Sequence, residues 1–134
     1  MITAVDTNIL LDILLPNEEF FERSQESLES ASAAGSLVIC DLVYAELCVH
    51  FDSQAVCDEF LNDTGIRPEA LSRPASFLAS RVWRRCRQQG GPRERILADF
   101  LIGAHAQAQA SRLLSRDRGF YRRMFPALDL LEPA

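Results

Sequence analysis

Short runs of β-prone residues alternate with helical stretches along the chain, and this alternation constrains the fold more than any other feature. Strands that alternate with helices favour βαβ units, which build a parallel sheet covered by helices on both faces. The sequence therefore predicts an α/β fold with a buried parallel sheet. The predicted strands are residues 2–5, 36–40, 66–71 (the weakest, because Pro68 interrupts it), 112–115 and 128–131.

Helix boundaries are marked by proline, glycine and capping residues. Pro16 stops the first helix, Asn17 can cap the second, and Gly35 and Gly65 follow the ends of two others. We find no internal repeat, low-complexity stretch or linker, so residues 1–134 are predicted to form one domain. The predicted helices are residues 7–15, 18–34, 42–51, 53–63, 74–89, 96–110 and 120–124.

Composition excludes several classes of protein. Apolar residues make up 48% of the chain and charged residues 25%, as in globular proteins. The beginning of the chain has no signal-peptide pattern and no run could span a bilayer, so we expect a cytoplasmic location and no membrane partner. All 14 basic residues are arginine, which excludes lysine-dependent chemistry such as Schiff bases, the P-loop lysine and the phospho-acceptor sites of receiver domains.

Two aspartates follow predicted strands. Asp6 comes directly after the first strand, and Asp117 lies two residues beyond the apolar part of the fourth. Groups just past the carboxyl ends of parallel strands converge on the ligand crevice of an open α/β sheet. Each aspartate alone is equally well explained as a turn or helix cap, but the pair suggests a site.

Two further acids interrupt apolar helices. Glu46 is the one charge within residues 42–49, and Asp99 is the one charge within residues 96–104. We expect Glu46 to be partly buried or aimed into a cleft, because a buried carboxylate without a partner costs several kcal/mol. Gly103 lies one turn after Asp99, where it marks either tight helix packing or the close approach of a ligand.

A divalent cation is the partner that best suits four such carboxylates. Crowded together, they could not all stay ionised without cations. Oxygen ligands without a cysteine or histidine cluster favour Mg²⁺ or Mn²⁺ over zinc. Such a site suits phosphodiester hydrolysis by a metal-activated water. The expected metal ligands and catalytic residues are Asp6, Glu46, Asp99 and Asp117.

Four segments in this order resemble the PIN domain, and within it the toxins of VapBC-type toxin–antitoxin modules. They are residues 5–10 (VDTNIL), 45–47 (AEL), 96–106 (ILADFLIGAHA) and 113–117 (LLSRD). Each motif alone is weak, whereas the ordered set spans nearly the whole chain. The resemblance implies a three-layer α/β/α, Rossmann-like fold with a five-stranded, mostly parallel sheet.

The resemblance also implies an activity and partners. Family members are Mg²⁺- or Mn²⁺-dependent endoribonucleases that cut tRNA or rRNA, form homodimers and are blocked by a cognate VapB-like antitoxin. It assigns the metal to the same four carboxylates. In the supporting positions, Asn8 would orient the first aspartate, Ser115 would support the site through its hydroxyl, and Arg116 occupies the usual arginine position.

Other candidate residues carry weaker signals. An arginine stripe on the helix of residues 74–89, continued beyond the Gly90-Gly91-Pro92 break, is the best local patch for RNA phosphates on a chain of net charge −5, although a solvated face explains it equally well. His50 is a weak candidate for supporting metal or water binding. His105, Trp83 and the four cysteines are expected to be packing residues. The stripe comprises Arg81, Arg84, Arg85, Arg93 and Arg95.

Two alternative functions remain open at the level of sequence. One is a nuclease of the same fold that acts on DNA flaps or other single strands. The other is a non-catalytic cation-binding α/β module, of which the receiver type is disfavoured by the missing lysine.

Overall fold

A five-stranded parallel sheet forms the centre of the protein. The computed structural model describes residues 1–15, 17–90 and 97–133. The strand order is β3-β2-β1-β4-β5, and every pair of neighbouring strands is parallel. This confirms the predicted α/β class and the five-stranded sheet. The strands are β1 (Ile2–Val5), β2 (Ser36–Cys40), β3 (Ile66–Glu69), β4 (Arg112–Leu114) and β5 (Leu130–Leu131).

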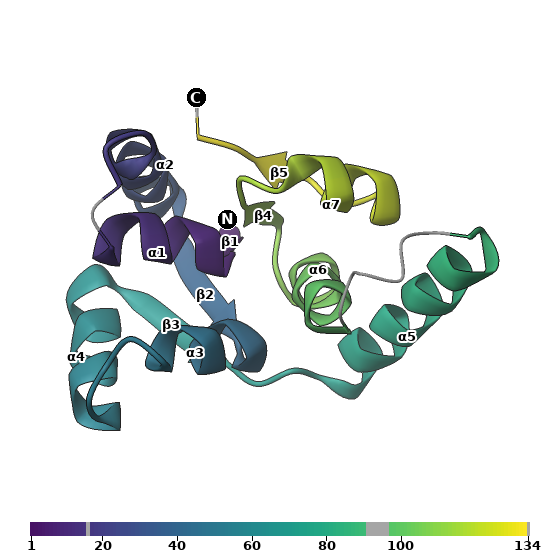
Figure 1. Ribbon diagram of the computed structural model, residues 1–134, viewed down its shortest axis with the longest axis horizontal. Coiled ribbons are helices and arrows are strands. Elements are labelled where there is room, and N and C mark those ends of the chain that lie inside the picture. Colours follow the sequence, from purple (N-terminus) through teal and green to yellow (C-terminus); the bar gives the residue numbers. More distant parts are fainter. Residues whose placement is uncertain (16, 91–96, 134) are drawn as a thin grey trace.

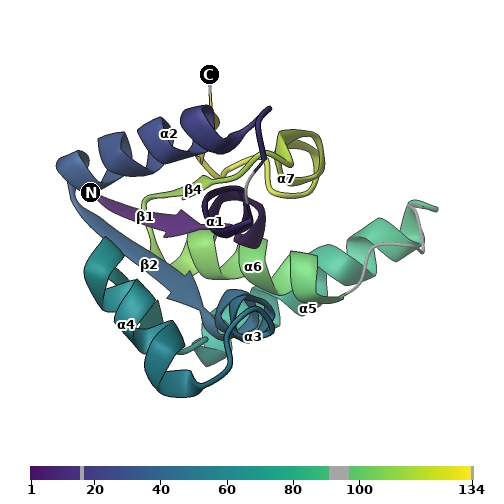
Figure 2. The ribbon, with the colours of Figure 1, turned by 60° about the vertical axis from the view of Figure 1, so that its left-hand side comes forward.

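Helices cover both faces of this sheet. Helices α1, α2 and α4 lie on one side and α5, α6 and α7 on the other, which gives three layers (Figure 1). Helix α3 contacts both α1 and α6, and α5 packs along α6 and extends away from the sheet (Figure 2). The helices are α1 (Thr7–Leu14), α2 (Phe21–Ala34), α3 (Asp41–Cys48), α4 (Gln54–Thr64), α5 (Arg73–Gln88), α6 (Leu97–Gln109) and α7 (Arg118–Met124).

Local signals in the sequence account for several helix boundaries. The predicted cap of the second helix was wrong: α2 begins at Phe21, and the Asn17 side chain accepts from the Glu19 and Phe20 N–H groups in the turn before it. The Ser53 side chain accepts a hydrogen bond from the Val56 N–H, and Ser72 caps α5 in the same way through the Ala75 N–H. Gly65 ends α4 in the left-handed region with φ of 72°, which a residue with a Cβ adopts at a cost. Pro68 is tolerated because β3 is an edge strand that pairs only with β2.

The hydrophobic core lies on the two faces of β1, β2 and β4. Four consecutive residues of β2 are buried, as expected for a central strand with helices on both faces. Helix α6 has a long run of buried residues in its middle and contacts β1 and β4. Within the described ranges, no helix combines the length and the apolar character that a membrane crossing requires.

Gly103 is the point at which α6 approaches the C-terminal part of the chain. A Cβ atom at this position would overlap the ring of Phe125, a residue that is 2% exposed. Phe125 also packs against Tyr121, with ring centroids 6.5 Å apart, so the ring has little freedom to move. The glycine therefore serves tight side-chain packing, which was the simpler of the two explanations offered by the sequence.

Gly103→Ala should destabilise the fold. The added methyl group forces the buried Phe125 ring out of place, and overpacking of this kind costs about 1–3 kcal/mol. Gly119→Ala is the matched control, because Gly119 is also helical, is exposed and has no atom within 4 Å of the position that a Cβ atom would occupy. Urea unfolding should show a lower midpoint for Gly103→Ala and an unchanged or higher one for Gly119→Ala. Equal midpoints for the two variants would contradict the packing role of Gly103.

Candidate active site at the carboxyl ends of the strands

Asp6 connects the end of β1 to the beginning of α1. Its carboxylate accepts hydrogen bonds from the Thr7 N–H at 2.8 Å and from the Ser115 hydroxyl at 2.7 Å. Ser115 directly follows β4, which pairs with β1 so that Val5 is opposite Leu114. Asp6 is only 6% exposed. Strand pairing thus places a buried carboxylate at the edge of the sheet where the sequence predicted a site.

Burial dominates the electrostatics of Asp6. It raises the pKa of the carboxyl above its ordinary value of 3.8, and the nearby charge of Asp99 raises it further. Hydrogen bonds from Ser115, the Thr7 N–H and Tyr121 act in the opposite direction but do not cancel the effect of burial. The charged form of Asp6 is therefore less favourable than that of an exposed aspartate, and a nearby positive charge would stabilise it.

Tyr121 on α7 lies near three of the carboxylates. It is 1% exposed, and its pKa is raised by burial first and then by the negative charges of Asp6, Asp99 and Asp117. These aspartates come from the end of β1, α6 and the start of α7, so the fold does bring them into one neighbourhood. Tyr121 was not among the residues expected at the site, because nothing in the sequence distinguishes it from an ordinary core aromatic residue.

Asn8 and Ser115 support the turn that carries Asp117. The Ser115 hydroxyl oxygen accepts from the Asp117 N–H at 3.0 Å and from the Asn8 amide at 3.4 Å. The Asn8 carbonyl oxygen accepts from the Arg116 N–H at 3.3 Å. Asn8 was expected to orient Asp6; it hydrogen-bonds Ser115, which itself bonds Asp6, and Arg116. The supporting role of both side chains stays a prediction.

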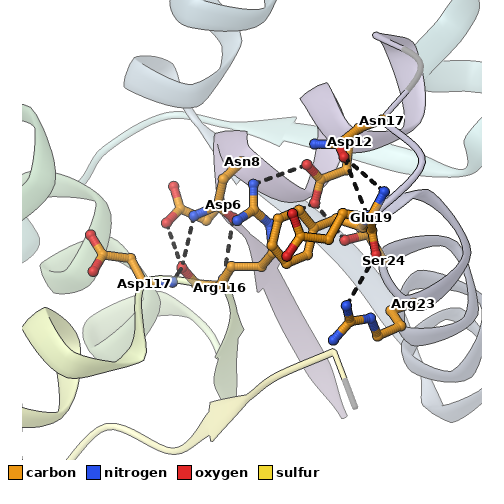
Figure 3. A network of polar contacts seen from close by, with 11 residues as sticks. Asp6, Asn8, Asp12, Asn17, Glu19, Arg23, Ser24, Arg116 and Asp117 are labelled. Atoms are coloured by element: carbon orange, nitrogen blue, oxygen red, sulfur yellow. Dashed lines mark hydrogen bonds and ion pairs between the residues drawn. The ribbon is translucent and has the colours of Figure 1, made fainter.

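Arg116 links the turn that carries Asp117 to α1. Its guanidinium donates to Asp12 at 2.7 and 3.0 Å and lies 4.0 Å from the centre of the Phe20 ring (Figure 3). Asp12 is 3% exposed and also accepts from the Ser24 hydroxyl at 2.6 Å. A two-bond pair of this kind fixes the geometry of both partners. Asp12 was overlooked in the sequence, although, like Glu46, it is a lone acid in an apolar helix.

Glu46 differs from its expected environment. We expected a partly buried carboxylate, but Glu46 and its neighbour Ala45 are exposed, and only Val43 and Leu47 of α3 are fully buried. The reason is that α3 is short and lies at the edge of the layers. The carboxylate accepts a hydrogen bond from the Thr7 hydroxyl at 2.9 Å, which places it beside the residue that follows Asp6 in the chain.

The four expected ligands are not arranged as a complete metal-coordination site. Within the described residues, no three Asp, Glu, His or Cys side chains stand close enough together to hold one ion. The expectation of a crowded cluster is thus corrected: Asp6 is held firmly, and the other carboxylates lie around it without converging. Their chemistry still fits a hard divalent cation, since all four offer oxygen ligands.

The remaining candidates are spread over other surfaces. Arg81, Arg84 and Arg85 are exposed on α5, while Arg93 and Arg95 lie outside the described residues. His50 is exposed. His105 is buried and hydrogen-bonds Glu69 of β3 at 2.9 Å, away from the Asp99 end of α6, and Trp83 packs near Phe100. His105 and Trp83 are therefore packing residues, as expected.

Comparison with known proteins identifies the family. The family model of the PIN domain matches residues 3–125, so this chain belongs to the PIN-domain family, whose members are generally nucleases. A search of curated protein sequences found no match.

Solved structures match the fold over nearly the whole chain. VapBC2 from Rickettsia felis, bound to a promoter DNA fragment, superposes with a TM-score of 0.77 at 22% identity, covering 98% of both chains. VapBC-1 from nontypeable Haemophilus influenzae gives 0.75 at 17% identity with the same coverage. A toxin–antitoxin complex from Klebsiella pneumoniae gives 0.70 at 17% identity, again covering 98% of both chains. At these identities the matches establish the fold.

Asp6→Asn should stabilise the metal-free protein at neutral pH. Because the folded-state pKa of Asp6 is raised, its stabilising contribution is complete below the ordinary value of 3.8 and is lost as pH rises through the folded value. The amide removes this loss, so in a chelator the variant should melt at a higher temperature than wild type. The two curves of melting temperature against pH should converge on acidification. Asp52→Asn, at an exposed loop position, should follow wild type throughout.

Proposed function

We propose that the protein is a Mg²⁺- or Mn²⁺-dependent endoribonuclease and the toxin of a type II toxin–antitoxin module. One observation carries the proposal: a PIN domain with a buried aspartate at the edge of its sheet, Asp6, and two further aspartates around the same tyrosine. Negative charge concentrated in this way favours a cation, because the pKa of Asp6 is raised by burial and by Asp99.

The residues proposed to hold the ion are Asp6, Glu46, Asp99 and Asp117. When bound, a divalent ion supplies an acidified water for attack on phosphorus and stabilises the leaving oxygen. Asp6 fits the role of fixed ligand, since its orientation is set by the Thr7 N–H and the Ser115 hydroxyl. Glu46 is exposed and Asp99 and Asp117 are partly exposed, so an ion in solvent has access to all three carboxylates.

The supporting residues keep that arrangement in register. Asn8 holds the Ser115–Arg116 turn through both its amide and its carbonyl group. Arg116, tied to Asp12, prevents the turn that carries Asp117 from moving away from α1. Thr7 directs Glu46 toward the same edge of the sheet. Their proposed part in the reaction is to position the carboxylates.

RNA is the proposed substrate, and α5 is its proposed binding surface. Arg81, Arg84 and Arg85 are exposed on the side of α5 opposite its buried stripe, and α5 packs along α6, which carries Asp99. Arg93 and Arg95 follow in the sequence, and we include them in the proposed surface on the sequence pattern alone. Guanidinium groups bind phosphates well, and a local patch is needed on a chain of net charge −5.

A VapB-like antitoxin and a second copy of the chain are the proposed protein partners, with action in the cytoplasm. The structurally similar proteins include a toxin–antitoxin complex. Several large apolar side chains are exposed, among them Val49 at 78%, Met1 at 63% and Phe77 at 60%. Exposed apolar groups of this size are suited to burial in an interface.

Purified protein should cleave single-stranded RNA only with Mg²⁺ or Mn²⁺. Chelation should abolish cleavage, and Asp6→Asn, Asp99→Asn or Asp117→Asn should reduce it at least about 100-fold, because each removes a charged ligand. Asp52→Asn is the control and should retain wild-type cleavage. Full activity of Asp6→Asn and Asp99→Asn would overturn the assignment of the site, and cleavage of DNA alone would support the alternative substrate.

A binding measurement separates the metal site from the reaction. Mn²⁺ at 100 times its dissociation constant should stabilise the wild-type protein by about 2.7 kcal/mol, measured as a shift in melting temperature. Asp6→Asn should lose this shift even though it is the more stable protein without metal. An equal shift in both proteins would place the ion elsewhere.

Expression without an antitoxin should arrest bacterial growth. Asp117→Asn should relieve the arrest at equal protein level, because it removes a proposed ligand and leaves the core unchanged. The measurement is culture density after induction, with protein abundance followed by immunoblot. If the wild-type protein accumulates and growth continues, the toxin role is wrong even if the protein proves to be a nuclease.

A further inference from the structure

Two of the four cysteines lie in direct contact. The Cys48 thiol donates to the Cys57 sulfur at an Sγ–Sγ distance of 3.4 Å. Cys48 is the last residue of α3 and Cys57 lies near the start of α4, so the sulfurs meet across a helix–loop–helix connection. Their spacing of nine residues fits no metal or redox motif, and both were expected from the sequence to be ordinary packing residues.

Neighbouring contacts hold this pair in place. The Tyr44 hydroxyl donates to the Asp58 carboxylate at 2.7 Å, one turn before Cys48 and one residue after Cys57. The rings of Phe51 and Phe60, each three residues beyond one of the cysteines, pack with centroids 5.7 Å apart. Helices α3 and α4 are therefore joined by two contacts next to the sulfurs, which keeps the sulfurs together in the folded protein.

The two thiols have different environments. Cys57 is fully buried, and burial together with the neighbouring Cys48 raises its pKa to about 12. Cys48 is only partly buried, so a reagent in solvent reaches it first. Cys40 and Cys86 are also buried, at 1% and 4% exposure. Among the described residues, the sulfur–sulfur contact found is the one between Cys48 and Cys57.

We propose that Cys48 and Cys57 form an oxidation site that takes a two-electron thiol oxidant of the hydroperoxide class and closes to a disulfide. The Cys48 thiolate attacks one peroxide oxygen and the O–O bond breaks, so Cys48 becomes a sulfenic acid. The other oxygen leaves as hydroxide and takes up the proton that the Cys48 thiol released, which gives the first water. The Cys57 sulfur then attacks the Cys48 sulfur, its proton goes to the departing hydroxyl group, and water leaves. In sum, two thiols and one hydrogen peroxide give one disulfide and two waters.

The geometry favours the second step over competing reactions. A disulfide needs an S–S separation of about 2.0 Å, so the two sulfurs must approach each other by about 1.4 Å. Small side-chain rotations can supply this movement. Cys57 is already in contact with Cys48, and its attack on the sulfenic acid therefore needs no diffusive encounter. Disulfides of this kind in reducing compartments are transient and serve redox chemistry. The proposal does not depend on the nuclease function.

Differential alkylation of the wild-type protein tests the site. The folded, metal-free protein is treated with a few equivalents of hydrogen peroxide, alkylated after denaturation, then reduced and alkylated with a second reagent. Peptide mass spectrometry should find Cys48 and Cys57 protected together and linked in one chain, with Cys40 and Cys86 alkylated in the first step. Dithiothreitol should restore all four thiols, and the bridged form should melt at a higher temperature than the reduced form.

Several results would overturn the proposal. They are four free thiols after treatment, a Cys48 that is oxidised to an acid without bridging, a bridge to Cys40 or Cys86, and a disulfide between two chains. Cys57→Ser serves as the matched variant and should accumulate sulfenic acid at Cys48, which dimedone labels, without forming a bridge. A control pretreated with alkylating reagent under native conditions should lose Cys48 reactivity first.

Discussion

The buried carboxylate of Asp6 is the interaction on which the rest of the site depends. Its burial is costly, and the donors that offset part of this cost come from three places in the chain: Thr7, the next residue, Ser115, which follows β4, and Tyr121 of α7. The Asp6 N–H also donates to the Leu114 carbonyl at 2.9 Å, extending the β1–β4 ladder by one bond. The pairing of β1 with β4 therefore fixes the position of the Asp6 carboxylate as well as the order of the strands.

The surrounding carboxylates are more exposed than Asp6, and this difference has a physical basis. Each further acid placed beside Asp6 adds repulsion, as the effect of Asp99 on the pKa of Asp6 illustrates. Three carboxylates close enough to bind the same ion would repel one another and destabilise the protein when no cation is bound. A protein that keeps one ligand rigid and the others at the rim avoids most of that cost. The proposed cation then brings the ligands together, and the binding energy is linked to stability.

Features that depend on a few adjacent residues could be predicted from the sequence. Runs of β-prone residues, Pro16 and the helix-ending glycines predicted the strand–helix order for this reason. The expected burial of Glu46 was wrong, because an apolar helix was assumed to be enclosed and α3 is too short and too peripheral for that. Asp12 was overlooked, because its partner Arg116 is 104 residues away and is brought near only by the fold.

The contact between Cys48 and Cys57 could not be predicted for a similar reason. Nine residues separate them, and the distance between their sulfurs depends on the angle at which α3 meets α4. Periodicity within either helix carries no information about that angle. The ordered set of PIN-like segments was the one long-range signal in the sequence, and the comparison with the family supports it over residues 3–125.

The two borders of the sheet limit how other molecules can attach to this protein. At one border β3 contains Pro68, which has no N–H to donate, flanked by the charged residues Arg67 and Glu69; at the other, β5 has only two residues. Such borders offer a poor template for a foreign strand and protect against association between sheets. A peptide or second subunit that binds tightly must therefore be recognised by side chains on the helices, and its specificity must come from their shape and charge rather than from backbone pairing.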